Sequence, residues 1–171
     1  MSEYVNPCGG VKWRTLSDGR IELEDGTIPT YAPTSADFRL LLLTWQNWAP
    51  QFRKAAKEYG VPVEWLVSIA TCEVGFLAHS AEKQRTAVSS DGYSSVGIMQ
   101  PIPSTAKLLG YTPDDRYDAQ ANINMGAALL VLLAKQYPQT QFGFPILAAM
   151  YNGGPGKTGS ACNTGNDKFN L

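Results

Sequence analysis

Apolar and polar residues alternate differently in the two parts of the chain, with a short extended segment first and helical patterns after it. Val11 to Thr15 and Ile21 to Leu23 are strand-like runs, and Asp18-Gly19 stands between them. Asp-Gly between two such runs is typical of a β-hairpin. From Ser35 onward the apolar residues recur at helical spacing. We therefore expect residues 1–35 to form an arm with a small hairpin, followed by helices.

Proline and glycine divide the helical part, because proline disrupts a helix interior and glycine often ends a helix. Pro50 is expected to break or kink the first helix, and residues 76–96 are expected to be irregular. The long helix near the end should turn Ile123, Ala127 and Leu130 inward, together with Ala134. One predicted helix begins at Ser35. The others cover Gln51 to Tyr59, Pro62 to Glu73, Pro103 to Leu109, Asp118 to Tyr137 and Phe144 to Tyr151. These elements predict a mainly α fold.

Glu73 ends one of these helical patterns and is the strongest candidate for chemistry. Val63, Leu66 and Ala70 form an apolar stripe that Glu73 continues, and Gly75 is expected to stop the helix. The chain holds no Lys or Arg from Leu66 to Ala81. A carboxylate in an apolar pocket without a cation tends to keep its proton, which is what a general acid of a glycosidase requires. The ordinary alternative is a solvated charge at a helix end.

Composition narrows the possible functions. The 171 residues suffice for one domain with a real core, and a net charge of −1 gives no field for nucleic acid or an anionic membrane. Residues 1–7 lack the basic start and apolar core of a signal peptide, and no apolar run is long enough to span a bilayer. We expect no nucleic-acid partner and no membrane insertion.

The cysteines allow one disulfide at most. Cys72 lies in a predicted helix and is expected to be a small buried hydrophobe. Cys8 and Cys162 could form a bridge if the two ends of the chain meet. These cysteines and the single histidine, His79, lack the paired spacing of a zinc site, so no metal and no cofactor are predicted.

Four short motifs occur in a fixed order and together carry a family resemblance. They are Ala55-Ala56 to Pro62 before the Glu73 helix, Gly97-Ile98-Met99-Gln100 within Ser95 to Ala106, Asn122-Ile123-Asn124-Met125-Gly126, and Met150-Tyr151-Asn152-Gly153-Gly154-Pro155-Gly156. With these motifs, residues 52–156 resemble the lysozyme-like domain of soluble lytic transglycosylases, with goose-type lysozymes as relatives. The resemblance implies a lysozyme-like (α+β) single domain over residues 36–156, with an arm at 1–35 and a Gly-rich tail at 157–171.

The resemblance implies that residues of the second motif make many of the contacts with the substrate. Gly97 would let the backbone approach the glutamate or a sugar ring closely. Gln100 would bond an N-acetyl or hydroxyl group, and Met99 would pack on a sugar face. Ser94 or Ser95 would bond the Glu73 carboxylate or the acetamido group. The alternative for this motif is a structural turn beside the core.

The third and fourth motifs are weaker indicators. Tyr151 would offer a hydroxyl and Asn152 an amide beside the acid, or the two would instead form an ordinary helix C-terminus. Asn122 and Asn124 are expected to cap or pack a helix rather than bind substrate.

Two departures from the family pattern concern Glu73 and the segment that follows it. Val74 follows the glutamate where the family commonly has Ser, and the long gap before Gly97 suggests an inserted loop at residues 76–93. Asp91 precedes Gly97 at the offset at which goose-type lysozymes carry an Asp. Asp91 is therefore either a second carboxylate that positions water or a solvated residue of an Asp-Gly turn.

The resemblance implies cleavage of the β-1,4 bond between N-acetylmuramic acid and N-acetylglucosamine in peptidoglycan. With Glu73 as the single catalytic carboxylate, the product would carry a 1,6-anhydro ring. The alternatives are a hydrolytic muramidase that uses Asp91, and a non-catalytic peptidoglycan-binding module. Without an export signal, the chain is expected to be a monomeric phage endolysin or a part of a virion or secretion machine, attached through residues 1–35.

Overall fold

The contacts in the computed structural model divide the chain into two compact units, Pro33–Leu132 and a second one made of Met1–Ala32 and Leu133–Leu171. The structure describes residues 13–16, 21–28, 35–90, 92, 94–136, 147–148 and 150–151.

The predicted hairpin is present in the described part of the arm. Strands β1 (Trp13–Thr15) and β2 (Ile21–Leu23) pair antiparallel. Arg14 lies opposite Glu22 in this register, and the two side chains form an ion pair across the strands. The backbone N–H of Thr27 donates to Asp25 Oδ1 at 2.8 Å, which closes a second turn directly after β2.

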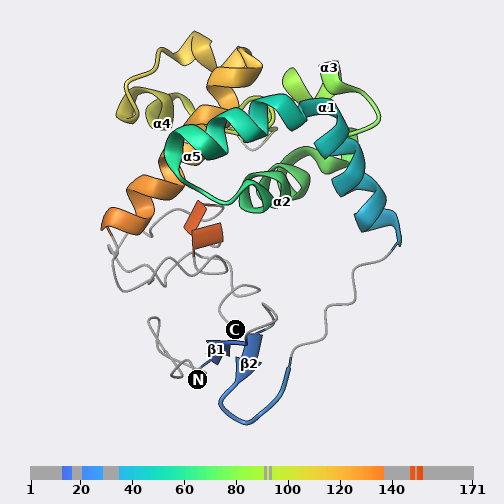
Figure 1. Cartoon of the computed structure of the whole chain (residues 1–171). Helices are drawn as coiled ribbons and strands as arrows, with labels where there is room; N and C mark the ends of the chain where they lie inside the picture. Colours follow the sequence, from blue (N-terminus) through green and yellow to red (C-terminus); the bar gives the residue numbers. More distant parts are fainter. Residues whose placement is uncertain are drawn as a thin grey trace. The chain divides into compact units, whose positions relative to one another are not determined.

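Helix α1 (Ser35–Tyr59) continues through Pro50. Of the break or kink expected at Pro50, the break is wrong, and the change of direction along the helix agrees with a kink (Figure 1). Proline lacks the N–H of an interior helical bond, which is a common cause of such a bend. Trp48 and Phe52, on either side of Pro50, are buried. At the far end of α1, the hydroxyl groups of Tyr59 and Tyr111 lie 3.0 Å apart.

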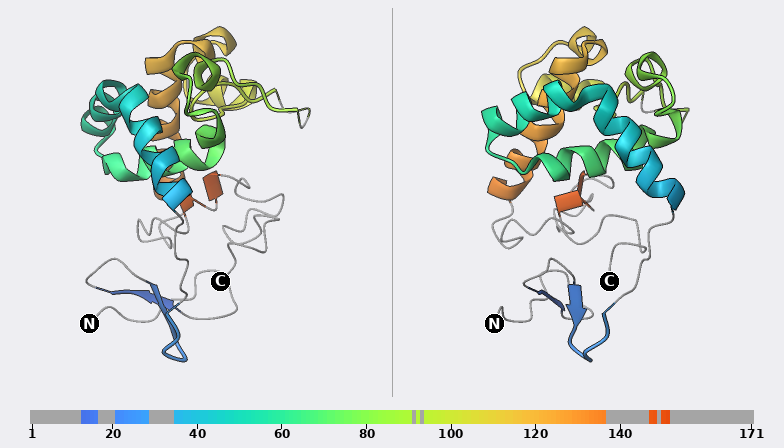
Figure 2. Two further views of the ribbon diagram at one scale, coloured as in Figure 1. Left: turned by 90° about the vertical axis from the view of Figure 1, so that its right-hand side faces the viewer. Right: turned by 45° about the vertical axis from the view of Figure 1, so that its right-hand side comes forward.

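Helix α2 (Val63–Val74) follows after a short turn and packs against α1 (Figures 1 and 2). The α-helix ends before Gly75, as predicted, but Gly75 has φ −59° rather than a left-handed conformation. A Cβ at Gly75 would lie 2.9 Å from the Thr71 Cγ2 atom, so glycine here serves close packing. The chain then continues as the 3₁₀ turn η1 (Gly75–Leu77).

The segment expected to be irregular contains a short helix, α3 (Ala81–Arg85). Its N-terminus is capped by Ser80, whose hydroxyl accepts from the backbone N–H of Lys83 at 3.3 Å. Helix α4 (Pro103–Leu108) agrees with the prediction, and Gly110 follows it with φ +82°.

The 3₁₀ helix η2 (Pro113–Tyr117) precedes helix α5 (Ala119–Gln136). The prediction for α5 is confirmed, since Ile123, Ala127 and Leu130 are at most 1% exposed. Residues 147–148 and 150–151 are helical, in agreement with the expected last helix. Within the described ranges, no helix combines the length and apolar character that crossing a membrane requires.

Candidate active site

Glu73 lies in the last turn of α2 and is partly exposed. The residues around it on the helix, Leu66, Ala70 and Val74, are buried. At Val74 the backbone leaves the helical conformation, with φ −136° and ψ 17°, and the chain turns into η1. Glu73 therefore stands at the edge between the apolar core and the surface, at a point where the chain changes direction.

Cys72, the neighbour of Glu73, is exposed, so the expectation of a buried residue is wrong. Nearby protein atoms nevertheless displace water from the thiol, and this desolvation raises its pKa. The negative charges of Glu73 and Asp37 raise the pKa of Cys72 further. Asp37, from the first turn of α1, thus contributes a second carboxylate near this end of α2. No sequence pattern marks Asp37 as a site residue, because an acidic residue in a first helical turn is common.

The second motif forms a tight turn, in which two residues of the motif and Ser94 just before it have positive φ angles. Ser94 has φ 55°, Gly97 has φ 83° and Gln100 has φ 49°. Val96 pairs with Val88 in an isolated β-bridge, and the N–H of Gly97 donates to the Ala87 carbonyl at 2.8 Å. The turn therefore lies against the strand-like segment that follows α3.

The Gln100 side chain is held inside this turn. Its Nε2 donates to the carbonyl oxygens of Gly97 at 2.7 Å and Ala87 at 3.3 Å, and its Oε1 accepts from the Ser95 hydroxyl at 3.0 Å. These bonds occupy both amide hydrogens, which favours the structural alternative for Gln100 and Ser95. Direct substrate contacts of these two residues stay predictions.

Asn122 fixes the turn to the start of α5. Its Oδ1 accepts from the N–H of Met99 at 2.8 Å, and its Nδ2 donates to the carbonyls of Val96 at 2.8 Å and Arg116 at 2.7 Å. Asn122 is 1% exposed, so the expected packing role is confirmed. A Cβ at Gly97 would lie 2.9 Å from the Asn122 Cγ atom. The close approach that Gly97 permits is thus to Asn122.

Met99 belongs to the core. Its side chain is fully buried, and a Cβ at Gly126 on α5 would lie 2.9 Å from the Met99 Cγ atom. The contact shown by the structure is therefore with α5, and packing of Met99 on a sugar face stays a prediction.

Arg116 is a residue of this region that the sequence analysis missed. Its guanidinium group is buried and donates to the carbonyl oxygens of Ser94, Pro101 at 3.3 Å and Pro113 at 2.7 Å. It therefore ties η2 to both ends of the turn. Together, Ser95, Gln100, Arg116 and Asn122 form what we call the turn network.

The remaining predicted site residues are outside this arrangement. Asp91 and Asn152 lie outside the described residues, as do Cys8 and Cys162. Tyr151 is helical and partly exposed, and it belongs to the other unit. In the part of the chain that the structure describes, no group of three or more His, Cys, Asp or Glu residues is arranged to hold a metal ion.

The fold and site define a class of protein, a small mainly helical lysozyme-like domain with a glutamate at a helix end and a tight turn fixed to a buried helix. The model of the transglycosylase SLT domain matches residues 50–169, and the chain belongs to this family. Members of the family are lytic transglycosylases that act on peptidoglycan. The matched range contains Glu73, the turn network and α5.

Proposed function

We propose that this protein cleaves the β-1,4 bond between N-acetylmuramic acid and N-acetylglucosamine in peptidoglycan, with Glu73 as its catalytic residue. The observation that carries the proposal is the position of Glu73 at the end of α2, within the range matched by the transglycosylase SLT domain. The partial exposure of Glu73 beside buried apolar residues supports it, because such a carboxyl group can reach a substrate and is only partly solvated.

In the proposed mechanism, the protonated Glu73 carboxyl donates its proton to the glycosidic oxygen as the bond to the muramic C1 breaks. The substrate's acetamido group stabilises the positive charge that develops at C1. The Glu73 carboxylate then removes the proton from the muramic C6 hydroxyl, whose oxygen bonds to C1 and closes the 1,6-anhydro ring. One carboxyl group serves both steps, first as acid and then as base.

The experiment compares Glu73→Gln with Glu64→Gln, an exposed glutamate in the first turn of the same helix. Glutamine keeps the shape of the side chain but cannot deliver a proton, so Glu73→Gln should lower cleavage of purified peptidoglycan by about 10²-fold or more. Glu64→Gln should leave cleavage unchanged. Activity of Glu73→Gln within tenfold of the wild type would remove Glu73 from the mechanism.

The products of the same reaction identify the chemistry. Mass analysis should find 1,6-anhydro ends, and Asp91→Asn should change the rate little. A hydrolytic muramidase needs a second carboxylate for its water. Reducing ends together with a large loss in Asp91→Asn would therefore replace the transglycosylase by a goose-type-like hydrolase. A folded wild-type protein that binds peptidoglycan without cleaving it would instead make this chain a binding module.

We further propose that the protein acts at the cell wall as a monomeric enzyme, either as a released phage endolysin or within a virion or secretion assembly. The arm at residues 1–35 would provide the attachment, and its hairpin, with its own strand pairing and ion pair, supports this role. Removal of residues 1–33 should leave peptidoglycan cleavage intact and abolish binding to the larger assembly. Loss of cleavage in the shortened protein would contradict a separate role for the arm.

A further inference from the structure

The side chain of Gln84, on the short helix α3, is fully buried and uses its whole amide group. Its Oε1 accepts from Asn47 Nδ2 at 2.9 Å and from Trp48 Nε1 at 3.0 Å, both on α1. Its Nε2 donates to the Thr44 hydroxyl at 3.0 Å and to the carbonyl oxygen of Val74 at 3.3 Å. Gln84 therefore connects α1 with the last residue of α2. We call these contacts the Gln84 network.

The bond to Val74 matters because of where this carbonyl lies. The carbonyl groups of a last helical turn have no N–H donor within their own helix. Gln84 thus donates to the carbonyl of the Val74–Gly75 peptide, one residue beyond Glu73, at the point where the backbone leaves the α2 helix.

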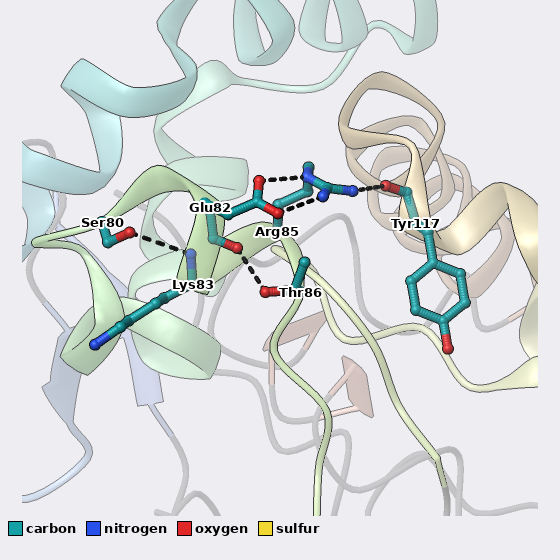
Figure 3. A network of polar contacts seen from close by, with 6 residues as sticks. All are labelled: Ser80, Glu82, Lys83, Arg85, Thr86 and Tyr117. Atoms are coloured by element: carbon teal, nitrogen blue, oxygen red, sulfur yellow. Dashed lines mark hydrogen bonds and ion pairs between the residues drawn. The ribbon is translucent and has the colours of Figure 1, made fainter.

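The other side of α3 is fixed to η2, as Figure 3 shows. The Arg85 guanidinium group binds the Glu82 carboxylate, with Nε at 2.9 Å from Oε2, and donates from Nη1 to the Tyr117 carbonyl at 2.9 Å. The Thr86 hydroxyl donates to the Glu82 carbonyl at 2.7 Å. Helix α3 therefore has polar contacts with α1 and α2 through Gln84 and with η2 through Arg85.

The residue before Tyr117 is Arg116, which donates to the carbonyl oxygens at both ends of the turn. Polar contacts thus lead from the end of α2 through Gln84 and Arg85 to η2, and from η2 to the turn. Since α3 lies in the segment that lengthens the gap between Glu73 and Gly97, this insertion contains the connection between the two parts of the site.

We infer that Gln84 is a positioning residue for Glu73. Through the Val74 carbonyl it sets the direction in which the end of α2 presents the carboxyl group. The inference rests on the proposed role of Glu73 as acid and base. A displacement of about 1 Å in such a group can cost about 10²-fold in rate, so a buried residue that never touches substrate can still control turnover.

The test replaces Gln84 by Met, which has a similar shape but cannot form the four bonds, and by Asn, which keeps a neutral amide one methylene shorter. The matched control is Leu130→Ala, a destabilising core substitution on α5 outside both networks. All variants are measured at a temperature at which circular dichroism shows them folded.

Two readouts are compared. On a soluble glycan oligomer, kcat of the Gln84 variants should fall about tenfold or more while KM changes less than about threefold, because a misplaced acid slows the chemical step. The titration of the Glu73 carboxyl, followed by NMR, should shift by about half a pH unit or more in the same variants. Leu130→Ala should show neither change.

A folded Gln84 variant that has the wild-type Glu73 titration, or a kcat no lower than that of Leu130→Ala, would overturn the inference. If only one of the two Gln84 variants folds, that variant alone decides the test. The titration does not depend on activity. Cleavage that persists in Glu73→Gln would therefore refute the proposed function, while an unchanged titration in the Gln84 variants refutes the positioning role.

Discussion

Gly97→Ala tests the geometry of the turn with one methyl group. Gly97 has φ 83°, in the left-handed region that disfavours residues with a side chain. The added Cβ would lie 2.9 Å from Asn122 Cγ and 3.1 Å from the Arg116 carbonyl oxygen. Carbon atoms in favourable contact are about 3.5–4.0 Å apart, so Asn122 has to move.

The expected loss of folding stability has two parts, the conformation of residue 97 and the hydrogen bonds of Asn122. The left-handed conformation alone costs alanine about 1–2 kcal/mol. Displacing Asn122 weakens its three hydrogen bonds to Met99, Val96 and Arg116, each with a net value of about 0.5–1.5 kcal/mol. For a protein of this size, about 1 kcal/mol changes Tm by about 2–4 °C. We expect Gly97→Ala to cost several kcal/mol and to lower Tm by about 10 °C or more.

Gly110→Ala is the matched control, because Gly110 has φ 82° and nothing lies within 4 Å of its added Cβ. Urea and thermal unfolding should show that Gly97→Ala costs more than Gly110→Ala by about 1.5–4.5 kcal/mol, the part due to Asn122. In an Asn122→Ala background, most of this excess should disappear. If the two glycine variants agree within about 0.5 kcal/mol, the packing of Gly97 on Asn122 does not constrain the turn.

Two pH-dependent predictions concern groups near α2 and α3. Since desolvation and the charges of Glu73 and Asp37 raise the pKa of Cys72, its alkylation by iodoacetamide, with the other two cysteines changed to serine, should be slow at neutral pH and faster in Glu73→Gln. Equal rates would contradict this coupling. Hydrogen bonding to Arg85 lowers the pKa of Glu82, so the pair stabilises the fold above the unfolded-state pKa of about 4.3 and loses this contribution as pH falls through the lower folded-state value. The free energy of unfolding, measured with urea, should therefore differ less between wild type and Glu82→Gln in acid than at neutral pH. A difference that stays constant with pH would refute this role of the pair.

The long helices could be predicted from the sequence because their apolar residues follow the helical period over several turns. Helices α2 and α5 lie within one or two residues of the predicted bounds. Helix α3 could not be predicted in this way, since Ala81–Arg85 is too short to show a period. It depends on the Ser80 cap and on the burial of Gln84 against α1, and the second of these is a tertiary contact.

The motif order located the turn but not the contacts inside it. The structure packs Gly97 and Met99 against α5, and their contacts with the substrate or the glutamate stay predictions. The partner that explains them, Asn122, lies 23 positions beyond Met99 in the chain, so no local pattern connects the two. Cys72 was misjudged for a related reason. Cysteine is commonly buried, but the buried face of α2 carries Leu66 and Ala70 and leaves Cys72 outside.

Five polar or charged residues are buried among those the structure describes, and all belong to the Gln84 network or to the turn network. They are Thr44, Gln84, Ser95, Arg116 and Asn122. The rest of the described core is apolar, and apolar cores accept exchanges of similar volume at modest cost. A library that varies the apolar core should therefore yield many active sequences. Each of the five polar residues can change only together with its partners, so an engineer who transplants this site to another helical scaffold has to carry both networks across as complete sets.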